Sequence, residues 1–420
     1  MRLLVLSLTF PFPASNGHKM RTWALLRALS AEQHEITVLT FADPDELKAN
    51  YGPLLEVSTE LEIVPLRLVG LSSGSDYLGR VRTLLGSLPH AVTRFSSSEM
   101  AQRVAGRLEA GKYDALLAET PYVLINVPRS LNVPLIVDNH NIEHLLLQRY
   151  LSIEQNPARR VYASIESRKM KAWEQRAWER SALSLVCSEN DRQVVQEISP
   201  GTPCAVVPNV VDAESYEVSH DCDSSTVLYT GGMDWYPNRD AVAFFVTQIL
   251  PRLRLQHPRV KFVVAGRSPS AEFRRRFEGI PGIVFTGTVP DMRQEIARAT
   301  VCVVPLRVGS GTRLKILEAA GMGKAVVATR VGAEGLDFVD GREIVLADEP
   351  AAFANAVSDL LAHEARRQTL GMAARRKLEE HYSFACLCKS VRESLDSLIP
   401  TRASLRPDRR IELAMERVGQ

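Results

Sequence analysis

The sequence predicts an α/β fold of the doubly wound class, with two lobes that each contain a parallel β-sheet. Short apolar runs alternate with stretches of helical periodicity along nearly the whole chain, and the runs are apolar at almost every position, as in strands buried on both faces. With 420 residues, the chain is also long enough for two domains of about 200 residues each.

We expect the first lobe over residues 1–212 and the second over 213–383, with residues 214–225 as a polar linker. Strands of the first lobe are predicted at 2–8, 35–40, 61–66, 114–118, 134–138, 183–187 and 204–207. Strands of the second lobe are predicted at 226–230, 260–265, 283–286, 301–304, 325–328 and 344–346. Helices are predicted at 18–32, 78–86, 98–110, 365–380 and 384–398, and the charged segment 401–420 is expected to be a flexible tail.

Composition narrows the class of protein. The net charge of +2 gives no general attraction to nucleic acid. The six cysteines are scattered and form no Cys-x-x-Cys pair, so we expect the reducing cytoplasm rather than a disulfide framework. The apolar start is interpreted as a strand rather than a secretory signal, because Pro11 and Pro13 interrupt it. No run approaches the roughly 20 apolar residues of a membrane-spanning helix.

The segment 302–336 predicts a phosphate site. A buried strand is followed by a loop with glycines and by a helix that begins near Thr312. Free N–H groups at a helix start attract anions, and Gly311 allows the backbone to come close. Arg313 and Lys315 add positive charge, and Glu318 can accept hydrogen bonds from a sugar diol. The plain alternative is a strand–loop–helix unit with a charged solvent face. The chain lacks a Walker pattern, which argues against a P-loop nucleotidase.

Residues 309–329, GSGTRLKILEAAGMGKAVVAT, followed by GAEGL at 332–336, resemble the nucleotide-sugar site of glycosyltransferase family 4. The resemblance extends over roughly residues 1–400 and implies the GT-B fold, in which two Rossmann-like domains face a cleft and a C-terminal helix, here 384–400, crosses back to the first domain. It also implies retaining transfer of a sugar from a nucleoside-diphosphate sugar to a glycan or lipid-linked acceptor, as in bacterial surface or exopolysaccharide assembly. Of the family's two glutamates separated by seven residues, the second matches Glu318, and Ser310 stands at the first.

The same resemblance gives roles to other residues. Gly17 matches a loop that presents its N–H to the diphosphate, and His140 matches a histidine beside the reacting sugar. Arg239 stands near a lysine that contacts the diphosphate, and Val289 and Met292 lie in the loop that receives the base. We expect His140, Arg239 and Lys315 to take part in the reaction and the donor to bind at Gly17, Ser310, Gly311, Thr312, Arg313, Glu318, Val289 and Met292.

A purely structural role is the alternative for several of these residues. Gly17 also suits a plain loop-to-helix turn, and Asp138 or Asn139 suits the N-cap of a helix that starts near His140. Arg239 also suits a solvated helix face.

We expect neither a metal nor a resident cofactor. His140 and His144, with Glu143 between them, have the helical spacing of zinc ligands, but the sequence shows no third ligand. The chain has no Gly-x-Gly-x-x-Gly after its first strand, which disfavours an NAD dehydrogenase. Two alternatives to a transferase stay open. One is a sugar-nucleotide epimerase of the same fold, which needs acidic and basic residues on either side of the sugar, and the other is a catalytically silent nucleotide-sugar-binding subunit.

The helical region 141–182 combines aromatic residues (Tyr162, Trp173 and Trp178) with many arginines and lysines. This composition suits peripheral contact with the inner face of a membrane. The glutamates between the basic residues favour the alternative, a solvated face with salt bridges.

Overall fold

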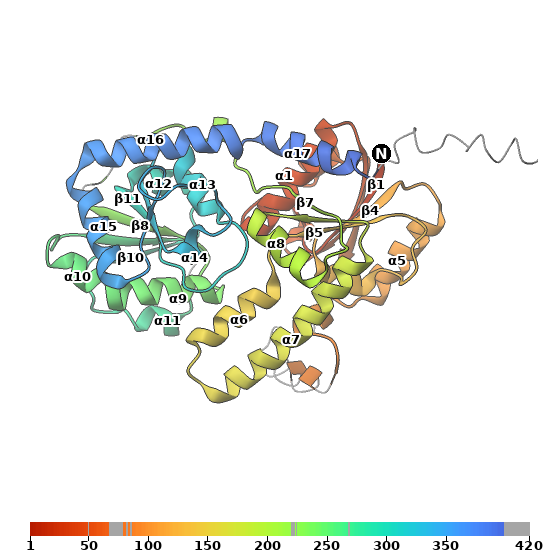
Figure 1. The fold of residues 1–420 in the computed structure, drawn as a ribbon, viewed down its shortest axis with the longest axis horizontal. Helices are drawn as coiled ribbons and strands as arrows, with labels where there is room; N and C mark the ends of the chain where they lie inside the picture. The colour runs from red at the N-terminus through yellow and green to blue at the C-terminus, as the bar shows by residue number, and fades with distance from the viewer. Residues whose placement is uncertain are drawn as a thin grey trace, which may run out of the picture.

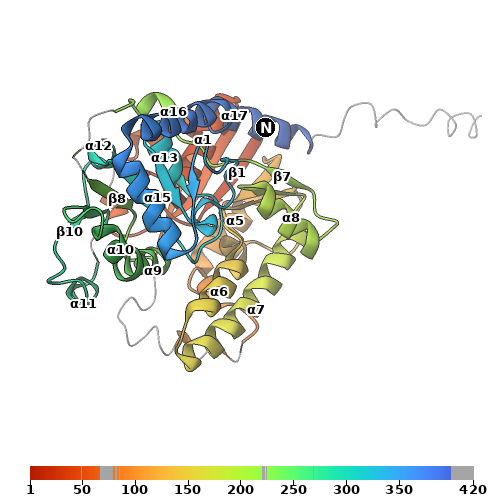
Figure 2. The same cartoon turned by 60° about the vertical axis from the view of Figure 1, so that its left-hand side comes forward.

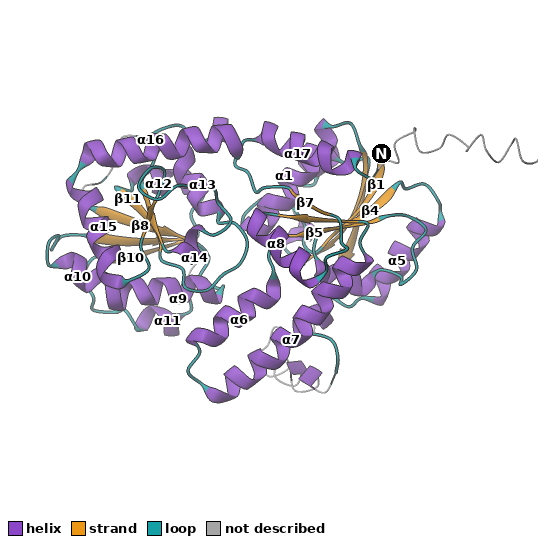
Figure 3. Ribbon diagram, viewed as in Figure 1, coloured by secondary structure: helices purple, strands orange, loops and turns teal. Residues whose placement is uncertain are grey.

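The computed structural model describes residues 1–398 except 49, 67–78, 81–82, 85, 220–222, 224 and 268. The expected tail at 401–420 lies outside the described residues, and the expected helix at 78–86 does so in part. The described chain forms two lobes, each a parallel sheet flanked by helices (Figures 1 and 3). The predicted α/β class with two doubly wound sheets is therefore confirmed.

The first lobe contains a seven-stranded sheet in the order β3-β2-β1-β4-β5-β6-β7. Its strands are β1 (Arg2–Ser7), β2 (Glu35–Ala42), β3 (Glu60–Pro65), β4 (Ala115–Ala118), β5 (Leu135–Asn139), β6 (Leu183–Val186) and β7 (Cys204–Val206). Its helices include α1 (Gly17–Ala31), α2 (Gly52–Val57), α4 (His90–Thr93), α5 (Ser98–Glu109) and α8 (Glu189–Ile198). The strand order reverses between β1 and β4, and ligands of open parallel sheets bind beyond the carboxyl ends of the strands at such a point.

The predicted helical region 141–182 forms two antiparallel helices, α6 (Glu143–Ile153) and α7 (Pro157–Arg180), which project from the first lobe (Figures 1 and 2). The break between them follows from the local sequence. Asn156 caps α7 by accepting from the N–H groups of Ala158 and Arg159, and Pro157 occupies the first helical position, where its missing N–H costs nothing.

The second lobe contains a six-stranded sheet in the order β10-β9-β8-β11-β12-β13. Its strands are β8 (Thr226–Thr230), β9 (Lys261–Ala265), β10 (Ile283–Gly287), β11 (Val301–Val304), β12 (Val326–Ala328) and β13 (Val345–Leu346). Its helices are α9 (Tyr236–Phe244), α10 (Leu250–Arg254), α11 (Ala271–Arg275), α12 (Met292–Arg298), α13 (Leu314–Gly321), α14 (Arg330–Ala333), α15 (Pro350–Ala362) and α16 (Glu364–His381). The GAEGL segment at 332–336 begins inside the short helix α14, which the Thr329 hydroxyl caps by accepting from Gly332 N at 2.9 Å.

The C-terminal helix α17 (Phe384–Asp396) returns to the first lobe and packs on α1 (Figure 1). Its buried residues Leu387, Val391 and Leu395 join the core beneath that helix. This arrangement agrees with the expected crossing of the helix at 384–400, of which 399–400 lie outside the described residues. The lobe boundary at 212/213 stays a prediction.

Candidate functional site at the junction of the lobes

The amino-terminal ends of two helices from different lobes meet at the junction. Gly17 is the first residue of α1, and Leu314 is the first residue of α13. A β-carbon built on Gly17 would lie 3.5 Å from Leu314 Cδ1, so the two helix starts are in contact. Each start carries free N–H groups and partial positive charge, which makes their meeting point favourable for an anion.

The loop before α13 is docked on the first lobe. Ser310 Oγ accepts from Ile142 N at 2.9 Å, and Asn209 Nδ2 donates to Thr312 Oγ1 at 2.5 Å. Gly311 lies between these two contacts with φ +73°, and a β-carbon on it would come within 2.5 Å of His140 O. Three residues predicted to bind the donor therefore join the two lobes in this structure.

A second link between the lobes involves a residue that the sequence analysis did not single out. Arg149 on α6 forms a two-pronged ion pair with Glu334, and its Nη2 donates to Glu334 Oε1 at 2.6 Å. The same guanidinium donates to Gly309 O. Glu334 lies in the GAEGL segment, so Arg149 connects the projecting helices to both loops of the predicted phosphate site.

Arg313 and Lys315 are cations held away from water. Arg313 Nη1 donates to the carbonyls of Ser310 and Gly311, but its Nε and Nη2 are buried without a hydrogen-bond partner. Lys315 Nζ donates to Asn238 Oδ1 at 3.3 Å and lies 4.0 Å from the centre of the Tyr229 ring. Burial lowers the pKa of Arg313 to about 10, and burial together with Arg313 lowers the pKa of Lys315 to about 7. A bound anion would stabilise both charges.

Glu318 lies one turn after Lys315 and accepts from the Tyr216 hydroxyl at 3.2 Å. Burial raises the pKa of its carboxyl. Val289 and Met292 lie near the start of α12, where Arg293 donates to Ser215 O at 2.9 Å. The expected base loop and the expected ribose acceptor are therefore both connected to the short segment that contains Ser215 and Tyr216.

Arg239 has different surroundings from Arg313 and Lys315. Its Nη1 donates to the carbonyls of Met233 and Asp234 at 2.9 and 2.8 Å, and the side chain is only partly buried. In this structure Arg239 therefore supports the turn that follows β8. Its contact with a diphosphate stays a prediction.

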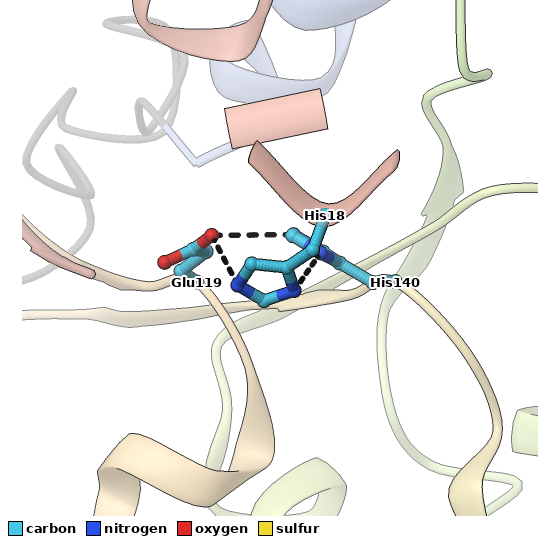
Figure 4. Close-up of side chains that lie close together, drawn as sticks. All are labelled: His18, Glu119 and His140. Atoms are coloured by element: carbon cyan, nitrogen blue, oxygen red, sulfur yellow. Dashed lines mark hydrogen bonds and ion pairs between the residues drawn. The ribbon is translucent and has the colours of Figure 1, made fainter. Parts of the chain in front are cut away.

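His140 lies in a cluster with His18 and Glu119 (Figure 4). The Nδ1 atoms of the two imidazoles are 2.9 Å apart, and His18 Nε2 is 2.9 Å from Glu119 Oε1. Neither His18 nor Glu119 was predicted from the sequence. Glu119 directly follows the buried strand β4, and this position beyond a strand is the signal that pointed to His140 and would also have found Glu119.

Asp138 lies beside the ring nitrogen of His140 that does not face His18. His140 Nε2 lies 3.0 Å from Asp138 Oδ2, and Arg21 holds both oxygens of this carboxylate. Arg21 also donates to Asn209 Oδ1 at 2.9 Å, which extends the network to the residue that contacts Thr312. Burial alone would raise the pKa of Asp138, but Arg21 and His140 outweigh it and lower that pKa to about 2.

Within the described residues, the group with suitable spacing for a metal ion is His18, Glu119 and His140. Ligation by both Nε2 atoms would leave the remaining proton of each ring on its Nδ1. Two N–H groups would then point at each other across 2.9 Å. The short contact between the Nδ1 atoms therefore argues against a metal ion held by both Nε2 atoms, which are buried here without a hydrogen-bond partner. His144 is no partner in it, since its Nδ1 lies 2.7 Å from Glu174 Oε2.

Glu143 is a second carboxyl group beside this cluster. Burial and the nearby Glu174 raise its pKa, and Asn141 Nδ2 donates to it at 3.3 Å. Tyr122 also hydrogen-bonds to this carboxyl and has a raised pKa itself because of its burial. The first lobe thus offers acidic and imidazole groups close to the junction.

Two family models match the chain in consecutive segments. The model described as Glycosyltransferase Family 4 matches residues 15–215, and the model described as Glycosyl transferases group 1 matches residues 224–363. Together they cover every strand of both sheets except β1, and they include the junction. The chain belongs to the glycosyltransferases with the GT-B fold.

Individual relatives of this glycosyltransferase are distant. An uncharacterized 44.6 kDa protein in the cps region of Klebsiella pneumoniae is 22% identical over 408 residues, which cover 93% of this chain and 98% of that protein. The sucrose-phosphate synthase of Thermosynechococcus elongatus superposes with a TM-score of 0.71 at 19% identity, covering 95% of this chain and 99% of the synthase. HepE of Anabaena, solved with UDP and glucose, superposes with a TM-score of 0.64 at 16% identity over 94% and 100% of the two chains.

The aromatic residues of α7 were considered for contact with a membrane, and the structure places two of them differently. Trp178 is fully buried and donates to Asn139 Oδ1 at 2.9 Å, and Trp173 donates to Pro121 O at 2.8 Å, so both indoles contact the lobe rather than solvent. Arg159, Arg160, Arg168 and Lys171 remain exposed. Among the helices of the described residues, none has the length and apolar character needed to traverse a bilayer.

Proposed function

We propose that the glycosyltransferase moves a sugar, with retention of its anomeric configuration, from a nucleoside-diphosphate sugar to a glycan or lipid-linked acceptor. The observation that carries this proposal is the meeting of the α1 and α13 helix starts beside two buried cations, Arg313 and Lys315. The negative charge of a bound diphosphate would stabilise both cations.

In this proposal the nucleotide lies along α13. Glu318 accepts hydrogen bonds from the ribose hydroxyls, and the backbone near Val289 and Met292 receives the base. The diphosphate binds between the N–H groups of Gly17 and of the α13 start. HepE was solved with UDP, which makes a uridine nucleotide the first to try.

The main contribution of the protein to the reaction is to stabilise the negative charge on the leaving group. As the bond between sugar and phosphate breaks, negative charge grows on the diphosphate, and the helix starts, Arg313 and Lys315 stabilise it. The departing phosphate accepts the proton of the acceptor hydroxyl, which attacks from the same face and so retains the configuration. His140 orients the sugar, and Glu143 with Asn141 contacts the acceptor.

Entry of the donor requires the lobes to separate. Ser310, Thr312 and Arg149 now bridge the lobes, and Arg313 Nε and Nη2 are fully buried. Opening would expose both cations, and closure around the donor would exclude water and limit its hydrolysis.

A sugar-nucleotide epimerase is the second candidate. The sequence offered no acid–base residues for it, but the structure brings His18, Glu119, His140 and Glu143 together at the junction. The matches to glycosyltransferase family models favour sugar transfer over epimerisation. The two activities can be distinguished because they give different products.

The pathway proposed here is the assembly of a surface or exported polysaccharide in the cytoplasm. The Klebsiella relative lies in a cps region, which supports this assignment. The exposed basic residues of α7 would bring the enzyme to an anionic membrane that carries a lipid-linked acceptor. Sedimentation with anionic vesicles should fall when Arg159, Arg160 and Lys171 are replaced by Gln, and equal binding to neutral vesicles would contradict this role.

The decisive assay follows the donor by NMR. The enzyme is incubated with UDP-, GDP- or ADP-sugars and simple sugar acceptors, and the anomeric proton of each product is recorded. We expect release of the nucleoside diphosphate and a product with the donor's configuration. An isomerised nucleotide sugar would favour the epimerase, and an inverted product would contradict retention.

A further inference from the structure

His18 and His140 are the central links in a chain of four side chains (Figure 4 shows three of them). Asp138 Oδ2 lies 3.0 Å from His140 Nε2, the two Nδ1 atoms lie 2.9 Å apart, and His18 Nε2 lies 2.9 Å from Glu119 Oε1. All four imidazole nitrogens therefore have a polar neighbour, and a carboxyl group stands at each end.

Both carboxyl groups are held as acceptors. Arg21 donates to both oxygens of Asp138. Glu119 accepts from Leu8 N at 2.7 Å and from the hydroxyls of Ser7 and Thr22. Donors directed at every oxygen favour the ionised form of each carboxylate.

A proton count then fixes the charge of the imidazoles. The Nε2 atoms lie 2.9 and 3.0 Å from ionised carboxylates, and this negative charge favours hydrogen on each of them, although neither Nε2 has a hydrogen bond. The Nδ1···Nδ1 contact needs one hydrogen between the rings. Two neutral imidazoles supply only two hydrogens, and this arrangement requires three. One ring is therefore an imidazolium.

The charges around the pair balance. Arg21 and the shared proton contribute two positive charges, and Asp138 and Glu119 contribute two negative charges. Glu143, at the start of α6, is a further carboxyl group, and its charge also raises the pKa of His18. Burial opposes protonation of both rings, but Glu119 outweighs it and raises the pKa of His18, whereas the pKa of His140 is lowered. The charge therefore resides mainly on His18.

His18 is also the ring that a ligand can reach. Its side chain is 27% exposed, whereas that of His140 is 7% exposed. It is the second residue of α1 and follows Gly17, which contacts Leu314 of the other lobe. A cation at a helix start is disfavoured by the helix dipole, and an anion bound there would reverse that penalty.

We propose that His18 and His140 hold one proton in common, and that the resulting cation is a third positive group, contributed by the first lobe, for the anionic leaving group of the donor. The binding part rests on the proposed function. The shared proton does not.

The proton is tested by NMR on protein labelled with [15N]histidine, using the full chain and its His18→Gln and Glu119→Gln variants. We expect one histidine that stays doubly protonated to a higher pH than a free imidazole, a signal that disappears in His18→Gln and titrates at lower pH in Glu119→Gln. Two neutral rings at pH 7 would overturn the shared proton, as would stoichiometric zinc in the purified protein.

The binding part is tested by calorimetry with UDP, GDP and ADP. We expect His18→Gln to weaken binding of the best nucleotide by roughly three- to tenfold, because the substitution removes a positive charge near the diphosphate while both ring nitrogens of His18 already face His140 and Glu119. The control is Lys19→Gln, since Lys19 is the next residue on α1 and pairs with Glu46 instead. Equal affinity in His18→Gln and the control would overturn the binding role. If wild-type protein binds none of the nucleotides, the proposed function fails, while the NMR result still decides the shared proton.

Discussion

Gly311 of the second lobe lies directly against the backbone of His140 in the first. A β-carbon on Gly311 would come within 2.5 Å of both His140 O and Asn141 Oδ1, and its φ of +73° already disfavours any other residue. The last residue of the predicted phosphate loop and the histidine expected beside the sugar are thus direct neighbours, although 171 positions separate them in the sequence.

Gly311→Ala should therefore keep the lobes from closing. We expect turnover to fall more than about tenfold, because small misplacements of reacting groups have large effects on rate. Gly341→Ala is the matched control, since Gly341 has φ +77° and open space around its Cα. Equal activity in the two variants would show that closure at Gly311 is unimportant.

Lys315 should take up a proton when a nucleotide binds. Its pKa is lowered to about 7 in the free protein, and a neighbouring diphosphate would raise it again. Calorimetry at pH 8 in buffers of different ionisation enthalpy should show proton uptake on binding, which Lys315→Met should abolish together with most of the affinity. Binding without proton uptake in the wild type would contradict a contact between Lys315 and the phosphates.

The ion pair between Arg149 and Glu334 should couple the lobes. In a double-mutant cycle with Arg149→Met and Glu334→Gln, we expect a coupling energy of roughly 0.5–3 kcal/mol in the free energy of donor binding. The control pair is Arg192 and Glu189, which lie within α8 and do not bridge the lobes. Additive effects of the two substitutions at the junction would exclude this coupling.

Asp138 should contribute to the acid stability of the first lobe. Its pKa is lowered from 3.8 to about 2 in the folded protein, so its contribution is present above about pH 4 and is lost as the pH falls towards 2. The shift corresponds to about 2 kcal/mol in the free energy of unfolding. Urea titrations at pH 5 and 3 measure how far the free energy of unfolding falls with pH. This fall should be smaller in Asp138→Asn than in Asp337→Asn, whose side chain is 80% exposed. An unchanged pH effect would contradict the ionised state of Asp138.

The sequence was most informative where one local pattern decides the structure. Buried strands such as β11 and the helix that carries Lys315 and Glu318 follow from apolar runs and helical spacing. The break at Pro157 was also readable from local signals, but the region was predicted as helical throughout.

Residues that act through partners distant in the sequence were harder to find. His18 and Glu119 are 101 positions apart, and only the pairing of β4 with β1 brings them together. Ser310 was expected to contact the donor, but here its hydroxyl accepts from Ile142 of the other lobe, a contact that depends on how the lobes pack. Trp178 was considered for a membrane surface, and its burial against Asn139 is likewise a matter of tertiary packing.

A crystal structure of the protein with the nucleoside diphosphate that binds best would show directly whether the junction between the lobes holds the diphosphate. We predict phosphate oxygens within hydrogen-bonding distance of the N–H groups at the starts of α1 and α13 and of Lys315 Nζ, with Glu318 on the ribose hydroxyls. A nucleotide bound away from these groups, with the junction between the lobes unchanged, would contradict the account.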